Sequence, residues 1–146
     1  MAAKKKKTSI PLRIIDLHGD GYHPLIDVRM LGKPFILVLD TGASKTAFDH
    51  DALLNAGGQT VITVSDRLST GLGTNSMASS TAIINDLLVG DLLIEPFEAA
   101  VLDLSTINLA YAGLGHPQVL GVLGGDILMK YKAVIDYGKK RLLLKS

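Results

Sequence analysis

The fold of this chain is decided by residues 35–43, which read Phe35-Ile36-Leu37-Val38-Leu39-Asp40-Thr41-Gly42-Ala43. The five apolar residues stand in a row without polar alternation, which predicts a β-strand covered on both faces. The strand ends at Asp40, and the Thr-Gly pair behind it predicts a tight turn. A carboxylate half-buried at such a junction is typical of acid–base chemistry. The alternative is that Asp40 only caps the following segment, because Asp is a common N-cap residue.

A second junction of the same kind lies near the C-terminal end. The apolar residues 119–123 lead into Gly124-Gly125-Asp126, and a helix-like stretch over 127–131 follows, starting at the Asp. Again an apolar strand meets a glycine-rich turn that carries an Asp. The repetition predicts two half-units of similar design within one small domain.

Glycines between apolar runs predict three β-hairpins, because a tight hairpin turn requires a positive φ that glycine adopts without strain. These turns contain Gly32, Gly90 and Gly138. Alternating or apolar runs predict further strands over residues 10–17, 25–31, 61–64, 82–89, 92–101, 132–137 and 142–144. Residues 48–56 predict a short helix ended by Gly57-Gly58, and residues 105–115 predict a loop or a short helix.

Taken in order, these features resemble the retropepsin-like aspartic peptidases, the group that includes the retroviral proteases. The run Asp40-Thr41-Gly42-Ala43-Ser44 resembles their active-site loop, and the run around Gly124 resembles the segment before their C-terminal helix. Between the two, the family carries a glycine-rich flap hairpin, and this chain has Ser69-Thr70-Gly71-Leu72-Gly73-Thr74 there. The resemblance extends from near Pro11 to the C-terminus. It implies an all-β fold, a closed retropepsin-like β-barrel with a flap hairpin and one or two short helices.

The resemblance also implies a function, hydrolysis of peptide bonds in extended polypeptides by an aspartic endopeptidase. Such enzymes use two carboxylates that share one proton, and this chain contains one Asp-Thr-Gly. It therefore implies a homodimer in which each chain gives one Asp40, with Thr41 and Gly42 completing the catalytic loop.

Substrate would be bound by Ala43 and Ser44 and by a flap tip at Gly71-Leu72-Gly73. The alternative, from another class of function, is a catalytically silent retropepsin-fold module that dimerises or binds peptide.

The chain departs from the retroviral pattern at two coupled positions. Retroviral enzymes have an acidic residue where this chain has Ser44, and an Arg where it has Gly125. In that family the two side chains form an ion pair within the subunit. Because both are absent here, no buried charge is left unpaired. We expect a different branch of the family rather than an inactive enzyme.

Length and composition exclude several other classes of protein. The 146 residues, 47% of them hydrophobic, predict one domain over residues 10–146. The absence of Cys excludes thiol catalysis and disulfides. The four histidines are scattered without the paired spacing of a zinc site, so we predict no metal and no cofactor. The formal net charge of +1 gives no reason to expect a nucleic-acid partner.

The two ends of the sequence carry separate expectations. Residues 1–9 contain four consecutive lysines and predict a flexible basic tail, with a tether to nucleic acid or to an acidic membrane as the alternative. Because Pro11, Arg13 and Asp16 interrupt the apolar residues that follow, we expect neither a signal peptide nor a membrane segment and favour a cytoplasmic location. Residues 10–15 and 142–144 read as edge strands, which we expect to pair across the two-fold axis of the dimer.

Overall fold

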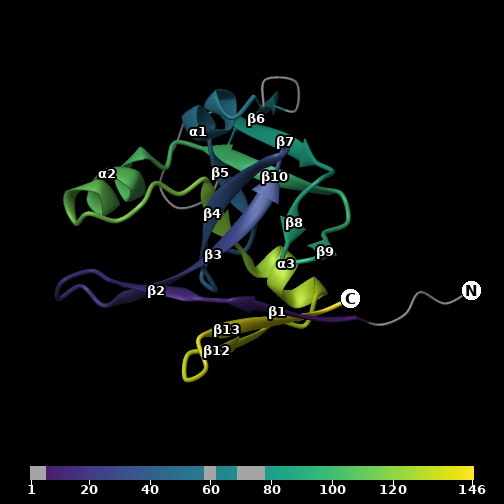
Figure 1. The fold of residues 1–146 in the computed structure, drawn as a ribbon. Helices are drawn as coiled ribbons and strands as arrows, with labels where there is room; N and C mark the ends of the chain where they lie inside the picture. Colours follow the sequence, from purple (N-terminus) through teal and green to yellow (C-terminus); the bar gives the residue numbers. More distant parts are fainter. Residues whose placement is uncertain (1–5, 58–61, 69–77) are drawn as a thin grey trace, which may run out of the picture.

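The computed structural model describes residues 6–57, 62–68 and 78–146, arranged as two β-sheets and three short helices (Figure 1). The expected flap tip at Gly71-Leu72-Gly73 lies outside the described residues. In chain order the elements are β1 (Lys7–Pro11), β2 (Arg13–Asp16), β3 (Tyr22–Met30), β4 (Lys33–Leu39), β5 (Ala47–Asp49), α1 (His50–Asn55), β6 (Ile62–Leu68), β7 (Ala78–Ile84), β8 (Leu88–Val89), β9 (Leu92–Leu93), β10 (Phe97–Leu102), α2 (Ser105–Gly113), β11 (Gly121–Leu123), α3 (Gly125–Lys130), β12 (Val134–Asp136) and β13 (Arg141–Lys145).

The larger sheet brings the two strand-to-turn junctions side by side. It has ten strands in the order β6-β7-β10-β5-β11-β4-β3-β8-β9, and β2 pairs with β3. In its middle, β11 lies between β4, to which it is parallel, and β5, to which it is antiparallel. Leu123 is paired with Leu39, so the glycine turn after β11 lies next to the turn that holds Asp40. The two junctions that look alike in the sequence therefore form one structural unit.

Alternation along β4 separates two apolar cores. Leu37 and Leu39 point into the main core, whereas Val38 belongs to a smaller cluster on the opposite face and Ile36 packs against that cluster. We call this smaller group the Tyr111 cluster; its buried members are Leu25, Val38, Ala47, Tyr111, Val119 and Val122. The β4–β11 ladder continues one residue further, because the Asp40 N–H donates to the carbonyl of Leu123 over 3.0 Å. Asp40 therefore projects from the same face as Val38.

The second sheet has three strands and contradicts the prediction for the chain ends. Its order is β1-β13-β12, so β13 is the central strand and pairs on both sides within one chain. Leu142 and Leu144 are fully buried in the main core, where α3 also packs through Ile127 and Leu128. Figure 1 shows α3 beside this sheet. The expectation that residues 142–144 form an edge strand was wrong. Removing them would take two leucines out of the core instead of only opening an interface.

Two predicted elements are divided differently in the structure. Residues 10–17 form two strands in different sheets, with the crossing at Leu12, whose N–H donates to the carbonyl of Lys140. The first strand begins at Lys7, inside the segment 1–9 that was expected to be a tail. The hairpin at Gly90 is confirmed, but it joins only the short strands β8 and β9. The predicted strands over residues 82–89 and 92–101 are each divided in two, because β8 pairs with β3 whereas β7 pairs with β10.

The predicted helix over residues 48–56 begins as a strand. Ala47, Phe48 and Asp49 form β5 because they fit between β10 and β11, fully enclosed by the sheet. Asp49 then caps α1, its Oδ2 accepting from the N–H of Ala52 over 3.0 Å. The segment 105–115, left open between loop and helix, contains α2. None of the helices in the described part of the chain is long and apolar enough to cross a membrane.

Candidate active site

The loop after β4 holds the carboxylate of Asp40 in place through backbone contacts. The N–H of Gly42 donates to Oδ1 of Asp40 over 3.0 Å, and the N–H of Ala43 donates to the Asp40 carbonyl over 3.1 Å. Asp40 is half-buried, whereas Thr41 and Gly42 are exposed. A Cβ at position 42 would lie 3.4 Å from Oδ1 of Asp40. The loop thus presents one fixed carboxylate beside an exposed Thr-Gly edge.

Thr46 and Asp126 connect this loop to the turn after β11. The hydroxyl of Thr46, which is fully buried, donates to Oδ1 of Asp126 over 2.7 Å and accepts from the N–H of Gly124 over 3.0 Å. Oδ1 of Asp126 also accepts from the backbone N–H groups of Thr46 and Ile127, each over 2.9 Å. Asp126 therefore holds the two turns together through hydrogen bonds and is not a second copy of Asp40. Sequence reasoning placed it at the start of a helix, as observed, but missed its contact with Thr46.

Glycine is required where the two strand-to-turn units touch. A Cβ on Gly121 would lie 2.0 Å from the carbonyl oxygen of Ala47 and 2.8 Å from the Cα of Phe48. A Cβ on Gly124 would lie 2.7 Å from the carbonyl carbon of Lys45. All of these neighbours are backbone atoms, which cannot move aside by a side-chain rotation. The close approach fixes the distance between β11 and the loop that carries Asp40.

Backbone hydrogen bonds join the two turns around Ser44 and Gly125, the positions at which the retroviral ion pair is absent. The N–H of Gly125 donates to the carbonyl of Ala43 over 2.7 Å, and the N–H of Asp126 donates to the carbonyl of Ser44 over 3.1 Å. Ser44 itself is exposed, and Ala43 is partly buried against the Tyr111 cluster. The structure thus joins the two turns without any side-chain charge at these two positions.

Comparison with known proteins agrees with this geometry. The family model described as aspartyl protease matches residues 26–127, which include both junctions. The chain belongs to the aspartyl protease family. No curated protein sequence matches it.

Solved structures of other proteins share this fold, among them two that match most of this chain. One is a retropepsin-like aspartic protease from Rickettsia conorii, with 21% identity, a TM-score of 0.57, and coverage of 99% of this chain and 96% of that one. The other is the retroviral protease-like domain of Ddi1 from Leishmania major, with 15% identity, a TM-score of 0.58, and coverage of 82% and 86%. Together they confirm the predicted retropepsin-like fold.

Sequence reasoning missed a group of side chains around helix α2 that lies on the same face of β4 as Asp40. The buried residue of this helix, Tyr111, packs on the face of β4 from which Asp40 projects. The phenol oxygen of Tyr111 lies 2.6 Å from Nδ1 of His23 on β3. The ring of His116 stands edge-on to Tyr111, with centroids 6.2 Å apart, and His18 stacks on His116. Two histidines that look scattered in the sequence, His23 and His116, therefore lie next to Tyr111, and a third, His18, stacks on His116.

The surroundings of Tyr111 change how readily its phenol ionises. Burial raises the pKa of Tyr111 above its ordinary value of 10.0, and the negative charge of Asp40 raises that pKa further. The charge acts on the phenol from the same face of β4, where Tyr111 packs with Val38. No spacing rule in the sequence signals this, because α2 reaches the site only through the tertiary fold.

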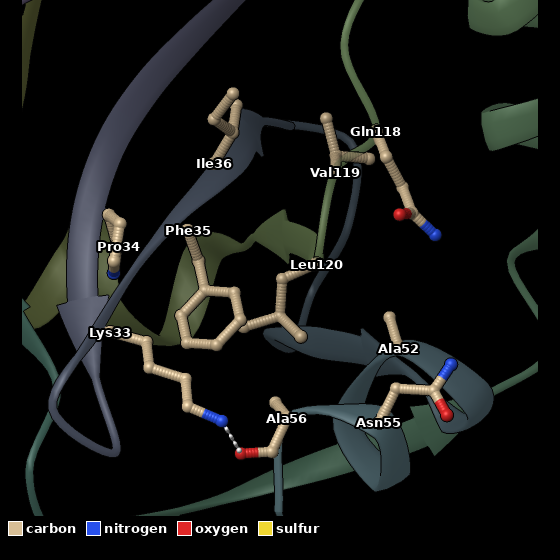
Figure 2. A pocket seen from close by; sticks show the side chains of 10 residues that line it. All are labelled: Lys33, Pro34, Phe35, Ile36, Ala52, Asn55, Ala56, Gln118, Val119 and Leu120. Atoms are coloured by element: carbon tan, nitrogen blue, oxygen red, sulfur yellow. Dashed lines mark hydrogen bonds between the residues drawn. The ribbon is translucent and has the colours of Figure 1, made fainter.

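A separate hollow lies at the other end of β4 in this protein. It has a volume of about 360 Å³ and is bounded by the turn into β4, by α1 and by residues 118–120. Figure 2 shows the ring of Phe35 beside Leu120, while Lys33 reaches the carbonyl of Ala56, at 3.2 Å. Asp40 does not line this hollow. Among the described residues, no group of three or more His, Asp or Glu side chains is placed to hold a metal ion.

Proposed function

We propose that the protein is an aspartic endopeptidase that cleaves extended polypeptides and is active as a homodimer. The observation that carries the proposal is the fixed Asp40 carboxylate beside an exposed Thr41-Gly42 edge, in a chain of the aspartyl protease family with one such loop. A two-fold axis along this edge brings Asp40 of a second copy to the first. The catalytic residues are then Asp40, Thr41 and Gly42 from each chain.

The two carboxylates hydrolyse the peptide as a pair. Like charges so close together cannot both be ionised, so one carboxyl keeps a proton. The ionised Asp40 takes a proton from a bound water, whose oxygen attacks the carbonyl carbon of the scissile bond. The protonated Asp40 gives its proton to the carbonyl oxygen, producing a tetrahedral diol. When the C–N bond breaks, the leaving nitrogen receives one proton and a diol hydroxyl loses another, which restores the singly protonated pair.

The residues around the pair have supporting roles in this proposal. Gly42, whose N–H already contacts Oδ1, keeps the carboxylate in its orientation, and Thr41 contacts the same loop of the partner. Ala43 and Ser44 bind the main chain of a substrate in a strand-like conformation, as do Gly71, Leu72 and Gly73 at the flap tip.

Digestion of a peptide library tests the proposal. Products are identified by mass spectrometry over a range of pH, in the presence of a chelator. We expect cleavage with a bell-shaped pH profile on the acid side of neutrality, because a pair that shares one proton is active only in its singly protonated form.

Activity per mole of protein should fall on dilution as the dimer dissociates. An optimum above about pH 8 without an acid limb would contradict a carboxylate pair.

A further inference from the structure

We propose that Tyr111 determines substrate specificity by limiting the size of the side chain accepted next to the scissile bond. This inference rests on the proposed peptidase function and adds to it a specificity residue outside the Asp-Thr-Gly loop. Three observations carry it: the face on which Tyr111 lies, the surface that it covers, and the contacts that hold it there.

Tyr111 lies on the catalytic face of the sheet. Ile36 and Val38 of β4 contact the Tyr111 cluster, and alternation along the strand places Asp40 on the same side. Ala43 of the catalytic loop packs against the same cluster. The effect of the Asp40 charge on the phenol agrees with this placement. A peptide bond held at Asp40 therefore has the Tyr111 cluster as its neighbour on this face.

The ring of Tyr111 covers the apolar surface that a substrate side chain would otherwise contact. Val38, Ala47 and Val122 come from three adjacent strands and form a small-residue surface beside the catalytic loop. Tyr111 packs on this surface and has a relative exposure of only 2%. A substrate in strand conformation sends alternate side chains to this face. Because the ring covers this surface, we infer that a large substrate side chain is excluded from it and a small one is accepted.

The position of Tyr111 is fixed both at the helix backbone and at the phenol oxygen. Asn108, one turn earlier in α2, forms two bonds with Val119: its Oδ1 accepts from the N–H over 2.8 Å and its Nδ2 donates to the carbonyl over 3.1 Å. The N–H of His116 donates to the carbonyl of Tyr111 over 2.8 Å. At the ring end, the phenol is bonded to His23. A side chain held in this way is rigid and does not move aside for a larger substrate side chain.

The test measures specificity as a ratio of rates. Peptides based on one cleaved sequence carry Ala or Phe in turn at each residue flanking the scissile bond, and kcat/KM is measured for each. Wild type should prefer Ala at one of these positions. Tyr111→Ala should raise the Phe-to-Ala ratio of kcat/KM there by about 10- to 100-fold, the range that a hydrophobic pocket of altered size supports.

Three further variants keep the test decisive. Tyr111→Phe retains the ring and should leave the ratio within about threefold of wild type, since a hydroxyl away from the substrate contributes little discrimination. Leu109→Ala, on the same helix at a side chain that is 73% exposed, is the matched control and should change nothing. Tyr111→Leu removes less volume and should give an intermediate ratio, even if Tyr111→Ala fails to fold.

Two outcomes overturn the inference and can be told apart. If wild type cleaves peptides and the folded Tyr111→Leu and Tyr111→Ala proteins keep the wild-type ratio at both positions, the inference fails while the proposed function stands. If wild type cleaves no peptide in the library, the proposed function fails and the inference falls with it.

Discussion

Asp40→Asn is expected to abolish peptidase activity while the protein stays folded. Asn has nearly the shape of Asp, and its Oδ1 can still accept the N–H of Gly42, which donates over 3.0 Å in the wild type. It cannot accept and return a proton at neutral or acid pH, so both roles of the carboxylate pair are lost. We expect kcat to fall by at least about 10³-fold, equivalent to about 4 kcal/mol of activation free energy. The measurement is a peptide assay together with a thermal unfolding curve.

Asp51→Asn is the matched control for this substitution. The side chain of Asp51 is 85% exposed and contacts the neighbouring His50, away from the catalytic loop. The Asp51→Asn substitution makes the same chemical change as Asp40→Asn and should leave peptidase activity unaffected. If Asp40→Asn keeps activity within about tenfold of wild type, Asp40 is not the catalytic acid–base group.

Gly121→Ala is expected to have the largest effect on stability. The new Cβ would overlap the carbonyl oxygen of Ala47 at 2.0 Å and the Cα of Phe48 at 2.8 Å. Relief requires β11 to separate from β5, which disrupts the middle of the larger sheet. We expect the free energy of unfolding to fall by at least about 3 kcal/mol, at the high end of overpacking effects. Chemical denaturation followed by circular dichroism measures this change.

Gly125→Ala is the control, because it adds the same methyl group four residues away. A Cβ there would lie no closer than 3.5 Å to its nearest neighbour, the carbonyl oxygen of Ala43. It also lies at the start of α3, where Ala is a better helix former than Gly, so stability should be unchanged or rise by up to about 1 kcal/mol. Equal destabilisation by both substitutions would show that close packing at Gly121 is not what the sheet depends on.

Much of this fold could be predicted from the sequence because its strongest local signals agree with its tertiary structure. The uninterrupted apolar run before Asp40 predicted a strand buried on both faces, and β4 does separate two cores. The glycines at positions 32, 90 and 138 marked real hairpins. Gly32 and Gly90 have the predicted positive φ, whereas in the turn that contains Gly138 the positive φ is on Lys140. The local sequence therefore predicted all three hairpins, but not the backbone geometry of the last one.

The features that were missed depend on contacts between distant parts of the chain. The pairing of β1 with β13 joins residues at opposite ends of the sequence, and no local pattern distinguishes it from pairing with a second copy. The strand at Ala47 exists because β10 and β11 enclose it. Tyr111 and His23 are 88 residues apart and meet only because α2 packs on β3 and β4. The Asp40 loop could thus be found in the sequence, whereas its neighbours in the fold could not.

The central claim is that each chain supplies half of the catalytic pair, and subunit mixing tests it most directly. Wild-type protein and Asp40→Asn protein are co-refolded at a series of ratios, and peptidase activity is measured at constant total protein. If each active site needs one Asp40 from each subunit, activity falls as the square of the wild-type fraction, to about one quarter in an equal mixture. A linear fall, to about one half in the equal mixture, would mean that one chain holds a complete site and would contradict the claim.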